Sequence, residues 1–329
     1  MNDNSAQLQA TAVSTTHTGA PIHVVVTCAN RKTEQVPARL RLAGLRERRP
    51  GHRFSAWTYR LATAGAAALP ATNLYAGEHW QIAKTLAHLL PSRTTHLWVC
   101  SAGYGLIRIS ANIQPYAATF ALGMADSVGE DRASTRDWWR RLTAWPGPEP
   151  GQPRSIADLS RRDPDSTIIA VLSDAYQRAC APDIVDAANH LRDTQQLSVL
   201  GPSNADLGDL VVPVSARLQA TFGGSLLSLN VRAAAYLLRS SSLGSAGLNR
   251  SEMQDRLQHA TDAVSAAPSR PAGRRLTDEQ VRAFIRSHLA DELGTATGLL
   301  RRLRKTGQSC EQARFGQLFA EVTASVGSA

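Results

Sequence analysis

Four short apolar runs, each followed by a polar turn, constrain the fold of this chain most strongly. They cover residues 22–27, 96–99, 167–172 and 195–200, and helix-compatible stretches separate them. Strands this short and this continuously apolar are typical of a parallel sheet whose two faces are both covered. We therefore predict an α/β fold over residues 21–240, a parallel-sheet sandwich with helices on both faces.

The polar turns after these runs predict a ligand crevice. In open α/β sheets, ligands bind beyond the carboxyl ends of the strands. Four polar strand ends in one sheet would converge on a single crevice, and this convergence is the main argument for a site.

The turn after the second run carries the most distinctive sequence of the chain. It reads Cys100-Ser101-Ala102-Gly103-Tyr104-Gly105-Leu106-Ile107-Arg108, and Gln114-Pro115-Tyr116 follows shortly after. The two glycines allow a tight turn and the close approach of a ligand to the backbone. An ordinary strand-to-helix turn is the alternative interpretation.

The residues from Ser101 to Arg108, with Gln114-Pro115-Tyr116, resemble the YaaA peroxide-stress DNA-binding family and its relatives. Three weaker similarities lie elsewhere in the chain. One is Thr27-Cys28-Ala29-Asn30-Arg31-Lys32, in which Lys32 is the matching basic residue. The others are Asp137-Trp138-Trp139 with Leu142-Thr143, and Leu172-Ser173-Asp174-Ala175-Tyr176. In the last of these, the acidic position of the family is shifted or replaced. The resemblance spans about residues 20–180 and implies a nucleic-acid-associated α/β domain. A more distant analogy of fold links the chain to uracil-DNA glycosylase-like enzymes and to the base-exchange enzymes of deazaguanine modification.

The charge of the chain favours a polyanionic partner. Its 329 residues carry a formal net charge of +9, and phosphate contacts supply most of the non-specific affinity for nucleic acid. Nearly all the positive residues are arginine, because the composition is rich in arginine and alanine throughout. A lysine in a candidate site, Lys32, is therefore noticeable.

Several classes of protein are disfavoured by what the sequence lacks. The four cysteines show no CxxC spacing and the nine histidines no HExxH pair, so we expect neither a metal nor another cofactor. Phosphate-binding P-loop and GxSxG sequences are also missing. No apolar run approaches the ~20 residues that span a bilayer. We expect a cytoplasmic protein with reduced thiols and no membrane partner.

Composition divides the chain into four segments. Residues 1–20 are rich in Ser, Thr, Ala and Gln and predict a disordered leader without a signal peptide. Residues 241–275 accommodate at most one helix, and their later half predicts a linker. Residues 276–329 predict three short helices, the first beginning with a capping box from Thr277 to Gln280. The module is consistent with a helix-turn-helix or winged-helix domain; a small protein-interaction bundle is the alternative.

Excision of a nucleobase from DNA is the chemistry that these residue types suggest. Breaking the N-glycosyl bond requires a carboxylate near the sugar or its attacking water and donors aimed at the base, which must first leave the stack. The candidates for catalysis are Asn30, Asp174 and Asp126, and those for base binding are Tyr104, Gln114, Tyr116 and Ser101. The candidates for DNA contact are Arg31, Lys32, Arg301, Arg302, Arg304 and Lys305.

Each of the main candidates also has a structural interpretation. Asp174 can cap the helix after its strand, Asp126 can belong to a surface turn, and Asn30 can form a local Asx-turn. Tyr116 can belong to the core. Our hypothesis is a DNA glycosylase that removes a modified base, in repair or in defence against phages, from a duplex with a flipped base. The alternatives are a non-enzymatic DNA-binding stress-response protein and an enzyme acting on free nucleosides or nucleotides.

Overall fold

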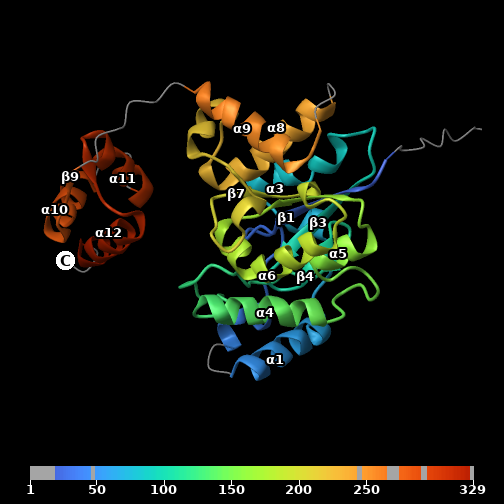
Figure 1. Cartoon of the computed structure of the whole chain (residues 1–329). Coiled ribbons are helices and arrows are strands. Elements are labelled where there is room, and N and C mark those ends of the chain that lie inside the picture. Colours follow the sequence, from blue (N-terminus) through green and yellow to red (C-terminus); the bar gives the residue numbers. More distant parts are fainter. Residues whose placement is uncertain (1–18, 46–48, 243–246, 265–273, 290–294, 327–329) are drawn as a thin grey trace, which may run out of the picture. The chain divides into compact units, whose positions relative to one another are not determined.

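A six-stranded sheet with the order β4-β3-β1-β6-β7-β8 forms the centre of the first part of the chain (Figure 1). The strands are β1 (Ile22–Thr27), β3 (Thr95–Ser101), β4 (Gly105–Arg108), β6 (Thr167–Val171), β7 (Leu197–Gly201) and β8 (Val211–Pro213). All neighbours are parallel except β4, which is antiparallel to β3. Every residue of β1, β6 and β7 is buried, as expected for strands covered on both faces. The predicted α/β fold and its four strands are confirmed.

Helices cover both faces of this sheet (Figure 1). One face carries α3 (Glu78–Ala83), α8 (Leu229–Ser242) and α9 (Arg250–Asp262), and the other carries α4 (Arg132–Ala144), α5 (Ile156–Arg162) and α6 (Asp174–His190). Helix α1 (Pro50–Thr63) packs on α4. Shorter elements are α2 (Ala71–Leu74), α7 (Gln219–Phe222) and the antiparallel pair β2 (Leu69–Pro70) and β5 (Asn112–Ile113).

The order of the strands places a topological switch point between β1 and β6. The chain goes from β1 to β3 on one side of this point in the sheet, and from β6 through α6 to β7 on the other side. The loops after these two neighbouring strands therefore separate and leave a crevice, the position at which open α/β sheets bind ligands.

The turn after β3 is a hairpin and not a strand-to-helix turn. Gly105 has a φ of 78°, a conformation that favours glycine, and the chain then returns as β4 with Leu106 opposite Cys100. The apolar residues Leu106 and Ile107 are thereby buried at the edge of the sheet.

The computed structural model describes residues 19–45, 49–242, 247–264, 274–289 and 295–326. Most of the predicted leader lies outside these residues. The chain divides into two units, Met1–Val264 and Ser265–Ala329. Helix α9 lies within the segment predicted as a linker, but Met253 and Leu257 belong to the core of the first unit. Among the described residues, no helix combines the length and apolarity needed to cross a membrane.

Over residues 274–289 and 295–326, the second unit forms three helices and a very short parallel ladder. The helices are α10 (Asp278–His288), α11 (Ala296–Lys305) and α12 (Gln312–Val326), and the ladder joins β9 (Arg274–Arg275) to β10 (Gln308–Ser309). Thr277 caps α10 in a capping box with Gln280, as the sequence predicts. Val281, Ile285, Leu299, Leu303, Phe315 and Leu318 form a separate core.

Candidate functional site

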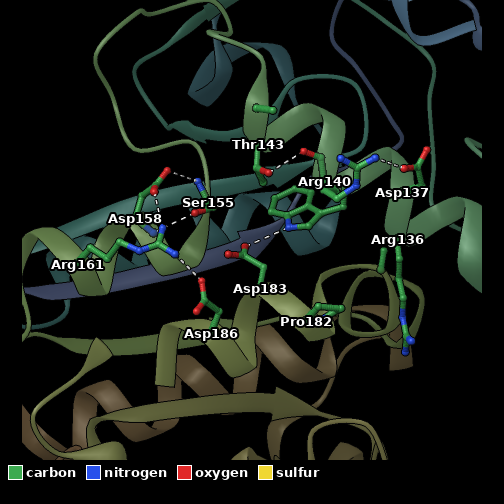
Figure 2. A pocket seen from close by; sticks show the side chains of 13 residues that line it. Arg136, Asp137, Arg140, Thr143, Ser155, Asp158, Arg161, Pro182, Asp183 and Asp186 are labelled. Carbon is green, nitrogen blue, oxygen red and sulfur yellow. Dashed lines mark hydrogen bonds and ion pairs between the residues drawn. The ribbon is translucent and has the colours of Figure 1, made fainter. Parts of the chain in front are cut away.

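One cavity of the first unit lies between α4, α5 and α6 and has a volume of about 680 Å³ (Figure 2). Most of its charged side chains form ion pairs: Arg140 pairs with Asp137, and Arg161 pairs with both Asp158 and Asp186. Arg136 pairs with Asp206, outside the lining. These pairs leave little charge to attract a ligand.

Asp183, in the wall of the same cavity, joins three elements. Its carboxylate accepts hydrogen bonds from Ile156 N (2.9 Å), Ala157 N (3.1 Å) and the Trp139 indole (3.0 Å). Burial raises the pKa of Asp183, and these three donors oppose the rise. A carboxylate at the N-terminus of α5 is a stabilising arrangement. We therefore interpret this cavity as part of the helix packing.

The second candidate is the crevice at the switch point, with a volume of about 330 Å³. This size lies at the small end of the range for ligand pockets. The end of β1 contributes Thr27, Cys28, Ala29, Asn30 and Arg31; the start of α3 and the turn before it contribute Ala76, Gly77, Glu78 and His79. Val171, Ser173, Ser225, Leu227 and Asn230 complete the lining.

Lys32 fixes the loop that carries Asn30 and Arg31 into the crevice. Its ammonium donates to Ala29 O (2.7 Å) and to Asn30 O (3.1 Å), and it lies 4.6 Å from the centroid of the Tyr116 ring. Burial lowers the pKa of Lys32. Sequence reasoning gave Lys32 a phosphate-binding role, but the structure directs its ammonium to the backbone. Arg31 is the exposed cation at the crevice.

His79 is the titratable side chain best placed for chemistry in the crevice. Its Nε2 lies 3.0 Å from Thr27 O. Since a carbonyl oxygen can only accept, Nε2 carries the proton, and Nδ1 of the neutral ring is unprotonated. Burial lowers the pKa of His79, which keeps the imidazole neutral at pH 7. Sequence reasoning missed this residue, because no motif surrounds it.

Glu78, at the start of α3, connects this wall of the crevice to α8 and to the loop before it. Its carboxylate accepts from Arg232 (2.7 Å) and from the Ser228 hydroxyl (3.0 Å). Arg232 and the two serines Ser225 and Ser228 lower the pKa of Glu78 to about 2. The carboxylate is therefore ionised at neutral pH, and the loop it holds presents Leu227, which is 90% exposed, at the crevice.

Of the three predicted catalytic residues, the structure brings Asn30 into the crevice. Asp174 is the first residue of α6 and pairs with Arg178 one turn later. The Asp126 carboxylate accepts from Ala43 N at 2.9 Å. Neither aspartate belongs to the lining that the structure describes, although Ser173, next to Asp174, does.

Of the four predicted base-binding residues, three are buried in the protein and Gln114 is half-buried. Ser101 and Tyr116 are completely buried, and Tyr104 is 3% exposed. The Ser101 hydroxyl accepts from Gly103 N and Tyr104 N. The side chain of Gln114 donates to Leu61 O at 2.6 Å and accepts from Ala66 N at 3.1 Å. These hydrogen bonds hold the segments of the core together.

The glycines of this motif allow close packing within the protein. A Cβ atom on Gly103 would lie 2.5 Å from the Tyr116 ring, and one on Gly105 would lie 2.9 Å from the Arg154 guanidinium. Side chains donate to three buried carbonyls of the turn. Trp138 donates to Ala102 O and Trp57 to Gly103 O, both at 2.9 Å, and Arg154 donates to Tyr104 O.

The other four predicted DNA contacts, Arg301, Arg302, Arg304 and Lys305, are exposed on α11 of the second unit. Within the residues that the structure describes, no group of three or more His, Cys, Asp or Glu side chains could hold a metal ion. A scan against protein-family models finds no match for this chain, and a search of curated proteins finds none either.

Proposed function

We propose that the crevice receives a modified nucleobase of DNA and that the protein removes it by hydrolysis of its N-glycosyl bond. The observation that carries this proposal is the position of Asn30 and His79 in one small crevice at the switch point. The flipped base of a duplex is the substrate, and the reaction serves repair or defence against phages in the cytoplasm.

Asn30 supplies recognition in this proposal. Its exposed amide offers both donors and an acceptor, the groups that read the edge of a base. Arg31, the next residue, is exposed and contacts a phosphate beside the flipped nucleotide. The Lys32 ammonium supports both by fixing the backbone of their loop.

His79 supplies the general base. Its unprotonated Nδ1 takes a proton from a water molecule, whose oxygen forms a bond to the anomeric carbon of the sugar. The bond from that carbon to the base breaks, and the base leaves with the electron pair. The positive charge that develops on the sugar is favoured by a nearby carboxylate. Glu78, which pairs with Arg232, is the carboxylate of the described lining. Asp174 and Asp126 do not belong to that lining.

The test is incubation with unmodified, uracil-containing and phage-hypermodified DNA, followed by mass spectrometry of the released bases. We expect Asn30→Ala and His79→Gln each to lower the rate of release by ~100-fold, the effect of removing one preorganised group. Asn189→Ala and His259→Gln are matched controls, because both residues are exposed and belong to other surfaces. No release from any DNA, or parent rates in both variants, would reject the proposal.

A second candidate function is DNA binding without catalysis. The net charge of +9 and the exposed basic residues of α11 favour it, because they need no chemistry in the crevice. DNA binding without release of any base would support this alternative. Release of a base from free nucleosides, with no binding of DNA, would instead support the alternative of an enzyme acting on free nucleosides or nucleotides.

A further inference from the structure

The ladder of the second unit brings two arginines to the end of α11. Arg274 pairs with Gln308, and Arg275 with Ser309. Arg274 N also donates to Gly307 O at 2.9 Å. Since α11 ends at Lys305, β9 lies beside the turn that follows this helix. Sequence reasoning placed both arginines in the linker.

Helix α11 has an apolar face and a basic face. Leu299, Leu300 and Leu303 are buried in the core of the unit. Arg301, Arg304 and Lys305 are exposed, and the spacing of three and four residues places them on neighbouring positions of the helix surface. Arg304 keeps an exposed guanidinium although it donates to Cys310 O at 3.2 Å.

Two acidic residues of the same unit pair with other arginines. Asp278 pairs with Arg314, and Glu321 pairs with Arg282. The favourable interaction of cations with a helix C-terminus accounts for the basic end of α11. It does not account for Arg274 and Arg275, which lie on a strand and add like charge to the same region.

We propose that β9 and the exposed face of α11 form one surface, the β9–α11 surface, that binds the sugar–phosphate backbone of DNA independently of base sequence. Its residues are Arg274, Arg275, Arg301, Arg304 and Lys305. The inference rests on the DNA partner proposed above and extends it to a second contact region, separate from the crevice.

DNA fits this surface better than a membrane does. A helix that binds a lipid surface exposes an apolar face, whereas the apolar face of α11 is buried, and the large exposed apolar side chains of the described chain all belong to the first unit. Backbone contact is also favoured over base readout, because arginine and lysine dominate the exposed side of α11, and contacts to phosphate carry no sequence information.

The experiment measures the affinity of the full chain for two short duplexes of unrelated sequence and unmodified bases, as salt is raised. We expect Arg274→Gln with Arg275→Gln to reduce the slope of log K against log salt by about 2, with equal loss on both duplexes. Arg282→Gln with Arg314→Gln is the control, because it removes the same charge from the same unit. Thermal melting checks that each variant is folded.

Three results would overturn the inference: an unchanged slope, a loss confined to one duplex, or an equal loss in the control variant. Tighter binding to vesicles of anionic lipid than to DNA, with the same dependence on Arg274 and Arg275, would also overturn it. Because both duplexes lack a target base and no release is measured, the result does not depend on whether the crevice excises bases.

Discussion

The hydroxyl oxygens of Ser101 and Tyr116 lie 2.7 Å apart in the core of the first unit, and the Tyr116 hydroxyl lies 2.9 Å from that of Tyr75. The three side chains connect β3 to the two loops beside it. Burial raises the pKa of both tyrosines, so the hydroxyl groups stay protonated and act as hydrogen-bond partners. The contact between Ser101 and Tyr116 therefore gives a structural role to the motif that contains both residues.

Replacing Tyr116 by Phe should therefore reduce stability. The change removes the hydrogen bonds that the Tyr116 hydroxyl makes with the buried hydroxyl groups of Ser101 and Tyr75. We expect a loss of about 1–3 kcal/mol in the free energy of unfolding. Urea denaturation measures it. Tyr59→Phe is the control, because Tyr59 is 69% exposed. Equal stabilities of the two variants would contradict the role given to Tyr116.

Gly103→Ala and Gly316→Ala should have opposite effects. The first places a methyl group against the Tyr116 ring, and overpacking of this kind destabilises by about 1–3 kcal/mol. Gly316 lies within α12 with open space around it, so alanine should stabilise that helix by about 0.5–1 kcal/mol. The melting temperature of the first unit measures the effect of Gly103→Ala, and that of the second unit measures the effect of Gly316→Ala. A stable Gly103→Ala variant would show that the turn can move away from the ring.

Stability should fall as the pH drops below about 6.5, the ordinary pKa of histidine. Burial lowers the pKa of His23, His79 and His96 in the folded protein. The unfolded chain therefore binds protons first. This stabilisation is complete above the unfolded pKa and is lost as the pH falls from that value through the lower pKa of the folded protein.

Thermal melting between about pH 7 and pH 5 measures this dependence. His23→Gln should weaken it, because His23 is 3% exposed and its ring is held by the Trp98 indole and by Asp163. A profile unchanged by the substitution would assign the dependence to other groups.

A chain that ends at Val264 should fold, whereas a chain that ends at Ser240 should melt at a lower temperature. The shorter chain lacks α9, whose Arg250 donates to Thr194 O and Leu197 O and whose Met253 is buried. Circular dichroism during heating compares the two. Identical melting curves would show that α9 adds nothing to the first unit.

The sheet could be predicted because its strands are marked locally. Residues 22–27 and 167–172 are mostly apolar without strict alternation, a pattern typical of a strand covered on both faces. The hairpin after β3 could not be predicted, because Gly103 and Gly105 suit many turns. The pairing of Leu106 with Cys100 depends on the edge of the sheet, which the sequence does not mark.

The crevice could be predicted only in part. Asn30 and Arg31 directly follow β1, so a rule about strand ends finds them. His79 and Asn230 come from the face that carries α3 and α8, and the fold brings them to the same crevice. The sequence shows Gly77 near His79 but not its φ of 99° before α3, so no sequence motif marks His79.

The inward orientation of the Ser101–Arg108 turn has a consequence for any saturation mutagenesis of this gene. Substitutions there should lower the amount of folded protein in the cell, so they would score as severely as the loss of a catalytic group in a screen for activity alone. Abundance and activity measured side by side would separate the two classes. Variants at Asn30 and His79 should have lower activity at normal abundance. Variants at Tyr116 should have lower activity and lower abundance.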